Sequence, residues 1–171
     1  MNQSIKYNIC KQDIFGTPLY NFNGVCAYSN QNNKHVSHEL NYFNGNFTGM
    51  KWQCVEYARR YIQTVYGVTF SEVDSAYQIP HATFTRLSDN KVIIPWIYRI
   101  NHNIELFEFL NNSLIIWEKN YESDSPHGHV AVIVYAKTDG IHVVEQNYDN
   151  NDFYRYIPLA DIKNATIISL I

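Results

Sequence analysis

Apolar side chains recur at three- and four-residue steps between Lys51 and Tyr66, which is the period of an α-helix. The positions are Trp52, Val55, Ala58, Ile62 and Val65. Gly67 follows directly, and glycine just beyond a periodic segment commonly ends a helix. The pattern therefore predicts an amphipathic helix over this segment, with Cys54 near its N-terminus.

The second half of the chain has the pattern of β-strands. Residues 129–135 (His-Val-Ala-Val-Ile-Val-Tyr) and 141–145 are rich in β-branched side chains, and Asp139-Gly140 between them is a hairpin signal. Further strands are predicted at residues 114–117, as a fully buried strand, and at 153–157 and 165–171. A helical N-terminal part followed by an antiparallel sheet is an α+β fold.

The other segments are predicted from weaker patterns. Short strands are expected at residues 24–29 and 68–70, and a second, shorter helix at residues 71–79. Residues 30–46 are rich in Asn, His and Ser and are predicted to be a surface segment, with His35 and His38 in solvent. The apolar groups within residues 84–101, around Val92 and Trp96, are predicted to be buried.

Composition describes a globular protein. The chain has 171 residues, of which 46% are hydrophobic, and we expect residues 1–171 to form a single domain. The net charge of -3 gives no basic face for nucleic acid, so nucleic acid is not an expected partner.

The sequence gives no sign of export or membrane insertion. The first twenty residues build no apolar signal-peptide core, and the longest apolar runs are too short to span a bilayer. Cys10, Cys26 and Cys54 make an odd set without a close pair, which argues against a disulfide framework. We therefore expect a cytoplasmic protein with no membrane partner.

Cys54 is the first candidate for chemistry. At the start of a helix, unpaired backbone N–H groups and the positive end of the dipole favour a thiolate, which is the nucleophilic form of cysteine. The alternative is that Cys54 is a small buried hydrophobe, as free cysteines often are. The catalytic interpretation requires a base and an acid elsewhere in the chain.

His129 and Glu145 supply that base and acid in the order Cys, His, acid. Their spacing raises a difficulty. With Asp139-Gly140 as a two-residue loop, Glu145 would lie opposite Val134, about 16 Å along the strand from His129. Bringing them together would require a bulge, strong twist or an asymmetric connection.

Three motifs resemble the CHAP family of cysteine, histidine-dependent amidohydrolases and peptidases. They are residues 49–60 (Gly-Met-Lys-Trp-Gln-Cys-Val-Glu-Tyr-Ala-Arg-Arg), 128–133 (Gly-His-Val-Ala-Val-Ile) and 144–147 (Val-Glu-Gln-Asn). Within that family they look most like the amidase domain of glutathionylspermidine synthetase/amidases. The resemblance implies a papain-like (NlpC/P60-type) core, with the helix that bears the nucleophile packed on an antiparallel sheet.

By this resemblance Cys54 would be the nucleophile, His129 the base and Glu145 the residue that orients it. Arg59 and Asn147 would contact the substrate, a glutathione–polyamine conjugate such as glutathionylspermidine, which would be hydrolysed to glutathione and spermidine. No cofactor is implied, and we expect no synthetase domain.

The residues themselves suggest further roles at this site. The backbone N–H of Cys54 could stabilise the oxyanion, with Gln53 or Asn147 as a second donor. Arg60 is expected to be a solvated charge, and His127 a surface residue.

Three alternatives stay open from the sequence. The first is a peptidoglycan-cleaving CHAP amidase or endopeptidase with the same three catalytic residues. The second is a zinc hydrolase using His127, His129, His142 and Glu145, although no zinc-binding motif is present. The third is a binding module without catalytic activity, in which Cys54 is structural.

Overall fold

The computed structural model describes residues 14–100, 110–120, 125–148 and 153–170. Its largest element is an antiparallel sheet of strand order β12-β11-β10-β9-β13-β8. These strands are β8 (Trp96–Ile100), β9 (Leu114–Trp117), β10 (His129–Lys137), β11 (Gly140–Val144), β12 (Tyr154–Pro158) and β13 (Ala165–Ser169). The predicted α+β class is confirmed.

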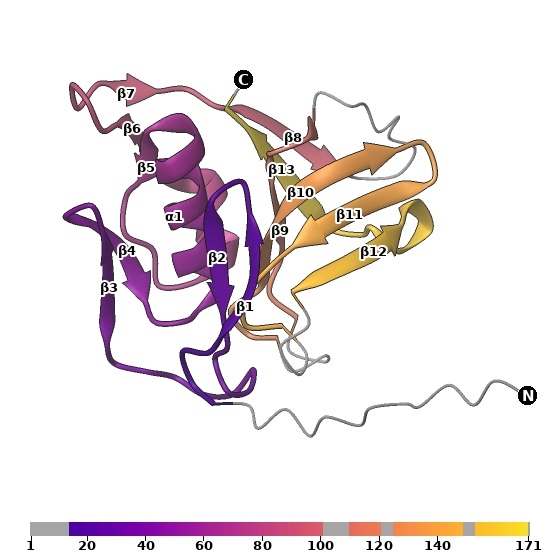
Figure 1. The fold of residues 1–171 in the computed structure, drawn as a ribbon. Coiled ribbons are helices and arrows are strands. Elements are labelled where there is room, and N and C mark those ends of the chain that lie inside the picture. The colour runs from indigo at the N-terminus through magenta and orange to yellow at the C-terminus, as the bar shows by residue number, and fades with distance from the viewer. Residues whose placement is uncertain (1–13, 101–109, 121–124, 149–152, 171) are drawn as a thin grey trace, which may run out of the picture.

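The N-terminal half forms smaller units beside this sheet (Figure 1). Strands β1 (Pro18–Phe22) and β2 (Val25–Tyr28) pair as one hairpin, and β3 (Leu40–Phe43) and β4 (Asn46–Met50) as another. The helix α1 (Cys54–Tyr66) follows, then a small sheet of β5 (Val68–Phe70), β6 (Phe84–Arg86) and β7 (Val92–Ile93). Two 3-10 helices, η1 (Ala76–His81) and η4 (Leu159–Asp161), complete the described elements.

Helix α1 matches its prediction at both ends. It begins at Cys54, and Gly67 caps its C-terminus in the left-handed conformation with a φ of 62°. The Gly67 N–H bonds to the carbonyls of Gln63 and Ile62, which satisfies two of the groups that a helix end leaves unpaired. The helix packs against β10, β4 and β5, so its first residue is held beside the large sheet.

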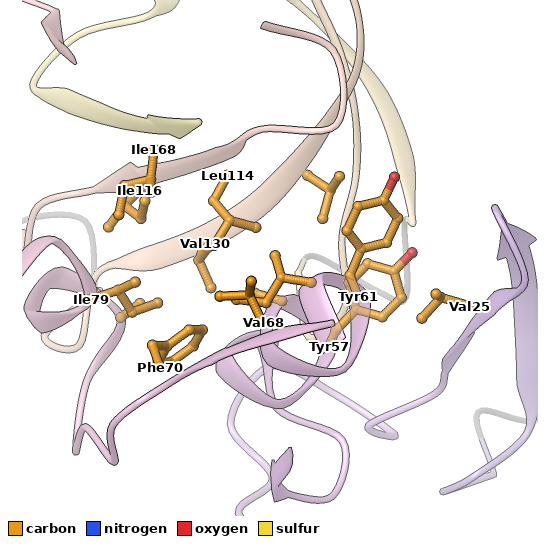
Figure 2. Close-up of a cluster of buried hydrophobic side chains, with 14 of the residues drawn as sticks. Val25, Tyr57, Tyr61, Val68, Phe70, Ile79, Leu114, Ile116, Val130 and Ile168 are labelled. Atoms are coloured by element: carbon orange, nitrogen blue, oxygen red, sulfur yellow. The ribbon is translucent and has the colours of Figure 1, made fainter. Parts of the chain in front are cut away.

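The central strands of the large sheet are buried on both faces. Leu114, Ile116, Val130 and Val132 pack toward α1 in one cluster, which Figure 2 shows in part together with Tyr57 and Tyr61 of the helix. The alternate residues of the same strands belong to a second cluster with members of β11, β12 and β13, namely Ile115, Ala131, Ile133, Ile141, Val143, Ile157 and Ile167. Burial on both faces explains why β9 and β10 are continuous apolar runs.

Residues 30–46 lie largely at the surface, as predicted, with His38 exposed and His35 half-buried, although Asn30 is fully buried. The β3–β4 hairpin within this segment was not predicted. Asn44 and Gly45 have positive φ angles and join β3 to β4, an arrangement that the dipeptide Asn-Gly favours. Asn23 and Gly24 also have positive φ angles and join β1 to β2, so an Asn-Gly dipeptide marks the turn of both hairpins in the sequence.

The apolar groups around Val92 and Trp96 were predicted to be buried, yet several are exposed. Trp96 is 65% exposed and Ile94 is 90% exposed. Trp96 belongs to β8, which lies at the edge of the large sheet and pairs with β13 alone among the described strands, and Ile94 lies in the link between β7 and β8.

The remaining predicted elements fall where expected. Residues 24–29 contain β2, residues 68–70 are β5, and the strands predicted at 114–117, 129–135, 141–145, 153–157 and 165–171 are β9 to β13. The helix predicted at residues 71–79 is the 3-10 helix η1, which starts later, at Ala76. Cys10 lies outside the described residues. Of the helices that the structure describes, none has the length and apolar character needed to cross a membrane.

Candidate active site

Cys54 occupies the first position of α1 and is partly exposed. Its thiol is acted on by His129 and by the backbone N–H groups of Val130 and Val55, all of which favour its charged form. Burial would raise the pKa of the thiol, but His129 and these N–H groups outweigh it, so the pKa lies below its ordinary value. The lowered pKa increases the share of the thiolate, which is the form that a nucleophile requires.

His129 opens β10 and lies between Cys54 and Glu145. Its Nε2 atom is 2.7 Å from Oε2 of Glu145, and its ring lies beside those of Trp117 and Tyr148, with centroids 5.9 and 5.3 Å away. Burial would lower the pKa of His129, but the charges and hydrogen bonds of Cys54 and Glu145 raise it to about 9. The ring therefore holds a proton that a leaving amine could accept.

Glu145 follows β11 directly and is completely buried. Its carboxylate pairs with His129 on one side and with Arg155 on the other. Burial would raise the pKa of Glu145, yet the hydrogen bonds and charges of His129 and Arg155 lower it. Glu145 is therefore an ionised buried carboxylate that fixes the ring of His129.

The register of the β10–β11 hairpin differs from the sequence prediction. Lys137 pairs with Gly140, so the two-residue loop is Thr138-Asp139 and not Asp139-Gly140. A bulge between Ile133 and Tyr135 then shifts the pairing once more, to Ile133 with Val143. The loop position moves Glu145 two residues closer to His129 than predicted, and the bulge, which was considered from the sequence, moves it one residue more, onto the same face as His129.

Gln53 and Asn147 lie together beside Cys54 in a network of amides. The Asn147 Nδ2 donates to Gln53 Oε1 at 2.8 Å, while Gln53 Nε2 donates to the carbonyl of His35 at 3.0 Å. Asn30, which is fully buried, donates to Asn147 Oδ1 at 2.8 Å. Gln53 Nε2 also donates to Asn30 Oδ1 at 3.5 Å, so Gln53 would have to give up a bond to serve as the second oxyanion donor, whereas the bond to Gln53 uses one of the two N–H groups of Asn147.

Arg59 was predicted to contact the substrate, and the structure gives it a different place. Its guanidinium is buried and donates to the carbonyls of Thr48, Phe70 and Ser71 at 2.8 to 3.2 Å. These bonds tie α1 to β4 and β5. Arg59 is therefore part of the framework that holds the helix, because its donors are occupied by backbone acceptors.

Arg60 was expected to be solvated and is instead buried against Glu56. Its Nε and Nη2 atoms lie 2.7 and 3.1 Å from the Glu56 carboxylate, which also accepts from Asn41 and Gln146. Gln146 further donates to the carbonyl of Gln53 at 3.1 Å. This buried network fixes the residue that precedes Cys54, and the sequence analysis did not find it.

The sequence analysis also missed Arg155. Its signal was the alternation of β12, in which Tyr154 and Tyr156 are exposed and Arg155 between them points to the other face. His127 is exposed, as expected, and bonds through Nδ1 to Ser75 Oγ at 2.8 Å.

The structure gives no support to a zinc site. His142 bonds to the hydroxyl of Tyr154, away from the His129–Glu145 pair. Among the residues that the structure describes, no group of three or more His, Cys, Asp or Glu side chains could hold a metal ion.

Comparison with known proteins gives two curated relatives. The bifunctional glutathionylspermidine synthetase/amidase of Escherichia coli (strain K12) is 34% identical over 149 residues, covering 78% of this chain. The resemblance predicted from the sequence is confirmed. The protein of the same name from Shigella flexneri matches to the same extent. The chain spans 22% of the length of each of these relatives.

The comparisons with solved structures and with family models give weaker similarity. A solved structure, that of Ly7917 with the hydrolyzing product of MDP, aligns with a TM-score of 0.46 and 16% identity. The alignment covers 68% of this chain and 53% of that one. No family model matches the chain.

Proposed function

We propose that this chain is a cysteine amidase that hydrolyses the amide bond of glutathionylspermidine, or of a related glutathione–polyamine conjugate, to glutathione and spermidine. The observation that carries the proposal is the 2.7 Å contact between His129 and the buried Glu145 carboxylate, together with the effect of His129 on Cys54, whose thiol pKa it lowers. The amidase named in the curated relatives supplies the reaction class and the substrate.

The proposed reaction has two halves. The Cys54 thiolate attacks the amide carbonyl carbon, and the backbone N–H groups at the start of α1 are the nearest donors for the resulting oxyanion. His129 gives its proton to the departing amine as the C–N bond breaks, which leaves a thioester on Cys54. Neutral His129 then takes a proton from water, the hydroxide attacks the thioester, and the thiolate leaves as the acid is released.

Glu145 acts on both halves by stabilising the imidazolium and by fixing which His129 nitrogen faces it. We propose that the arrangement is a papain-like core, with α1 carrying the nucleophile and the large sheet carrying the base and the acid. No step requires a metal ion or an organic cofactor.

The test is to incubate glutathionylspermidine with the purified protein and to measure the spermidine that is released. Cys54→Ala should abolish release, whereas Cys26→Ala, a change at the other described cysteine, should leave it intact, and EDTA should have no effect. A muropeptide assayed in parallel distinguishes the wall-hydrolase alternative. Cleavage of the muropeptide alone would overturn the proposed substrate, and release by Cys54→Ala would overturn the proposed nucleophile.

A further inference from the structure

Glu145 has a second cationic partner besides His129. The Nε of Arg155 donates to Oε1 of Glu145, and Nη2 lies 3.3 Å from Oε2, the oxygen that also faces His129. Arg155 lies on β12 opposite Val143, so the contact joins the strand beyond the hairpin to the carboxylate. A two-point contact of this kind fixes both the position and the plane of a carboxylate.

The guanidinium of Arg155 is itself held in place. It lies over the ring of Tyr148 at 3.9 Å from the centroid and over that of Trp117 at 5.4 Å. The same two rings flank His129. Arg155 and His129 therefore share one carboxylate and two aromatic neighbours, although they come from strands that β11 separates.

A buried carboxylate between two cations has little freedom. Glu145 is fully buried, so without a permanent positive partner its charge would be costly whenever His129 becomes neutral. Arg155 supplies that partner because a guanidinium stays protonated. Its side chain is only 26% exposed, which limits the screening of this contact by solvent.

We propose that Arg155 is a positioning residue of the site, whose guanidinium fixes the orientation and the charge of Glu145 and, through Glu145, the ring of His129. The inference rests on the proposed function only in taking His129 as the base. It does not depend on which amide is the substrate.

The consequence for charge has a definite sign. The ionisable groups that contact His129 or Glu145 in the described structure are Cys54 from α1, Tyr148 after β11, and Arg155 from β12. Removing the positive charge of Arg155 leaves Glu145 a stronger partner for the imidazolium, since Glu145 stays ionised near neutral pH. The pKa of His129 should therefore rise, by about one unit for a lost charge at this range.

The test is an NMR titration of the His129 ring in the intact protein, which needs no substrate. Arg155→Met should raise the pKa of His129 by about one unit. Arg155→Lys, which keeps the charge, should leave it near the wild-type value. Arg86→Met removes an exposed arginine paired with Asp89 and serves as the matched control, with no shift expected.

The rate of Cys54 alkylation, followed by mass spectrometry of the Cys54 peptide, gives a second substrate-independent reading. Arg155→Lys should slow it at neutral pH, because the point charge of Lys cannot reproduce the two-point contact that positions Glu145 and the His129 ring. If Arg155→Met does not fold, Arg155→Gln tests the same loss of positive charge. An unchanged His129 pKa in the neutral variant would overturn the proposal, whereas failure to cleave glutathionylspermidine would overturn only the substrate assignment.

Discussion

His129 and Glu145 face each other at 2.7 Å across the β10–β11 hairpin, although they are not directly paired in the ladder. The register at Val132 and Val144, continued by one residue, sets Glu145 opposite Ala131, so that it shares a face with His129 two residues away. Long side chains reach such diagonal neighbours. The Thr138-Asp139 loop and the bulge between Ile133 and Tyr135 together establish this register, and the contact depends on both.

The activity should have a bell-shaped pH profile. The pKa of His129 is raised to about 9, so the proton needed by the leaving amine is retained through neutral pH and lost as the pH rises through about 9. The pKa of Cys54 is lowered, so the thiolate persists below the ordinary thiol range and is lost on the acid side. Measuring kcat/KM against pH checks both limbs, and a rate that keeps rising above pH 10 would contradict the role of His129.

Glu145→Gln should lower the pKa of His129 toward its ordinary value, because the anion that stabilises the imidazolium is removed. The alkaline limb of the pH profile should move to lower pH, and kcat/KM should fall by about 10²-fold or more. Glu39→Gln, which removes an exposed carboxylate paired with Lys51, should change neither the pH profile nor kcat/KM. A wild-type profile in Glu145→Gln would show that the carboxylate does not act on His129.

Gly128→Ala should disable the site. The φ of Gly128 is +64°, and an added Cβ would lie 2.4 Å from the Trp117 carbonyl oxygen, so the backbone before His129 must move. Gly67→Ala is the matched control, since its φ is +62° but its Cβ would meet nothing within 4 Å. The control should lose about 1–2 kcal/mol of unfolding free energy and keep its activity. Equal activity in the two variants, measured as Cys54 alkylation, would argue against this constraint.

Glu56→Gln should destabilise the protein strongly. It leaves the buried guanidinium of Arg60 without its negative partner, which costs about 3 kcal/mol or more. Asp89→Asn also removes one negative charge, but from an exposed pair with Arg86, and should cost under about 1 kcal/mol. Urea denaturation compares the two. Similar midpoints for both variants would mean that the Glu56–Arg60 pair contributes little.

The sequence was sufficient for the elements whose signal is local. The helix over Cys54–Tyr66 has a periodic apolar stripe and a glycine stop, and β9 and β10 are apolar because both sheet faces are buried. The short hairpins were missed because β1 and β3 have polar, exposed positions, although their Asn-Gly turns were readable.

Other features could not be predicted because they depend on what packs against a residue. Helical periodicity shows on which face of the helix Arg59 and Arg60 lie. It does not show that Arg59 donates to carbonyls of β4 and β5, or that Arg60 pairs with the Glu56 carboxylate. The register of the hairpin similarly depends on a bulge that no residue type marks. The resemblance to a known family was needed to pair His129 with Glu145.

The most direct test of the central claim is to trap the thioester. Glutathionylspermidine is mixed with the protein and hydroxylamine, and the products are separated by mass spectrometry. If Cys54 forms an acyl intermediate, glutathionyl hydroxamate should replace part of the glutathione while spermidine release continues, and Cys54→Ala should give neither product. Free glutathione alone at every hydroxylamine concentration, with Cys54 unmodified in acid-quenched protein, would contradict the account.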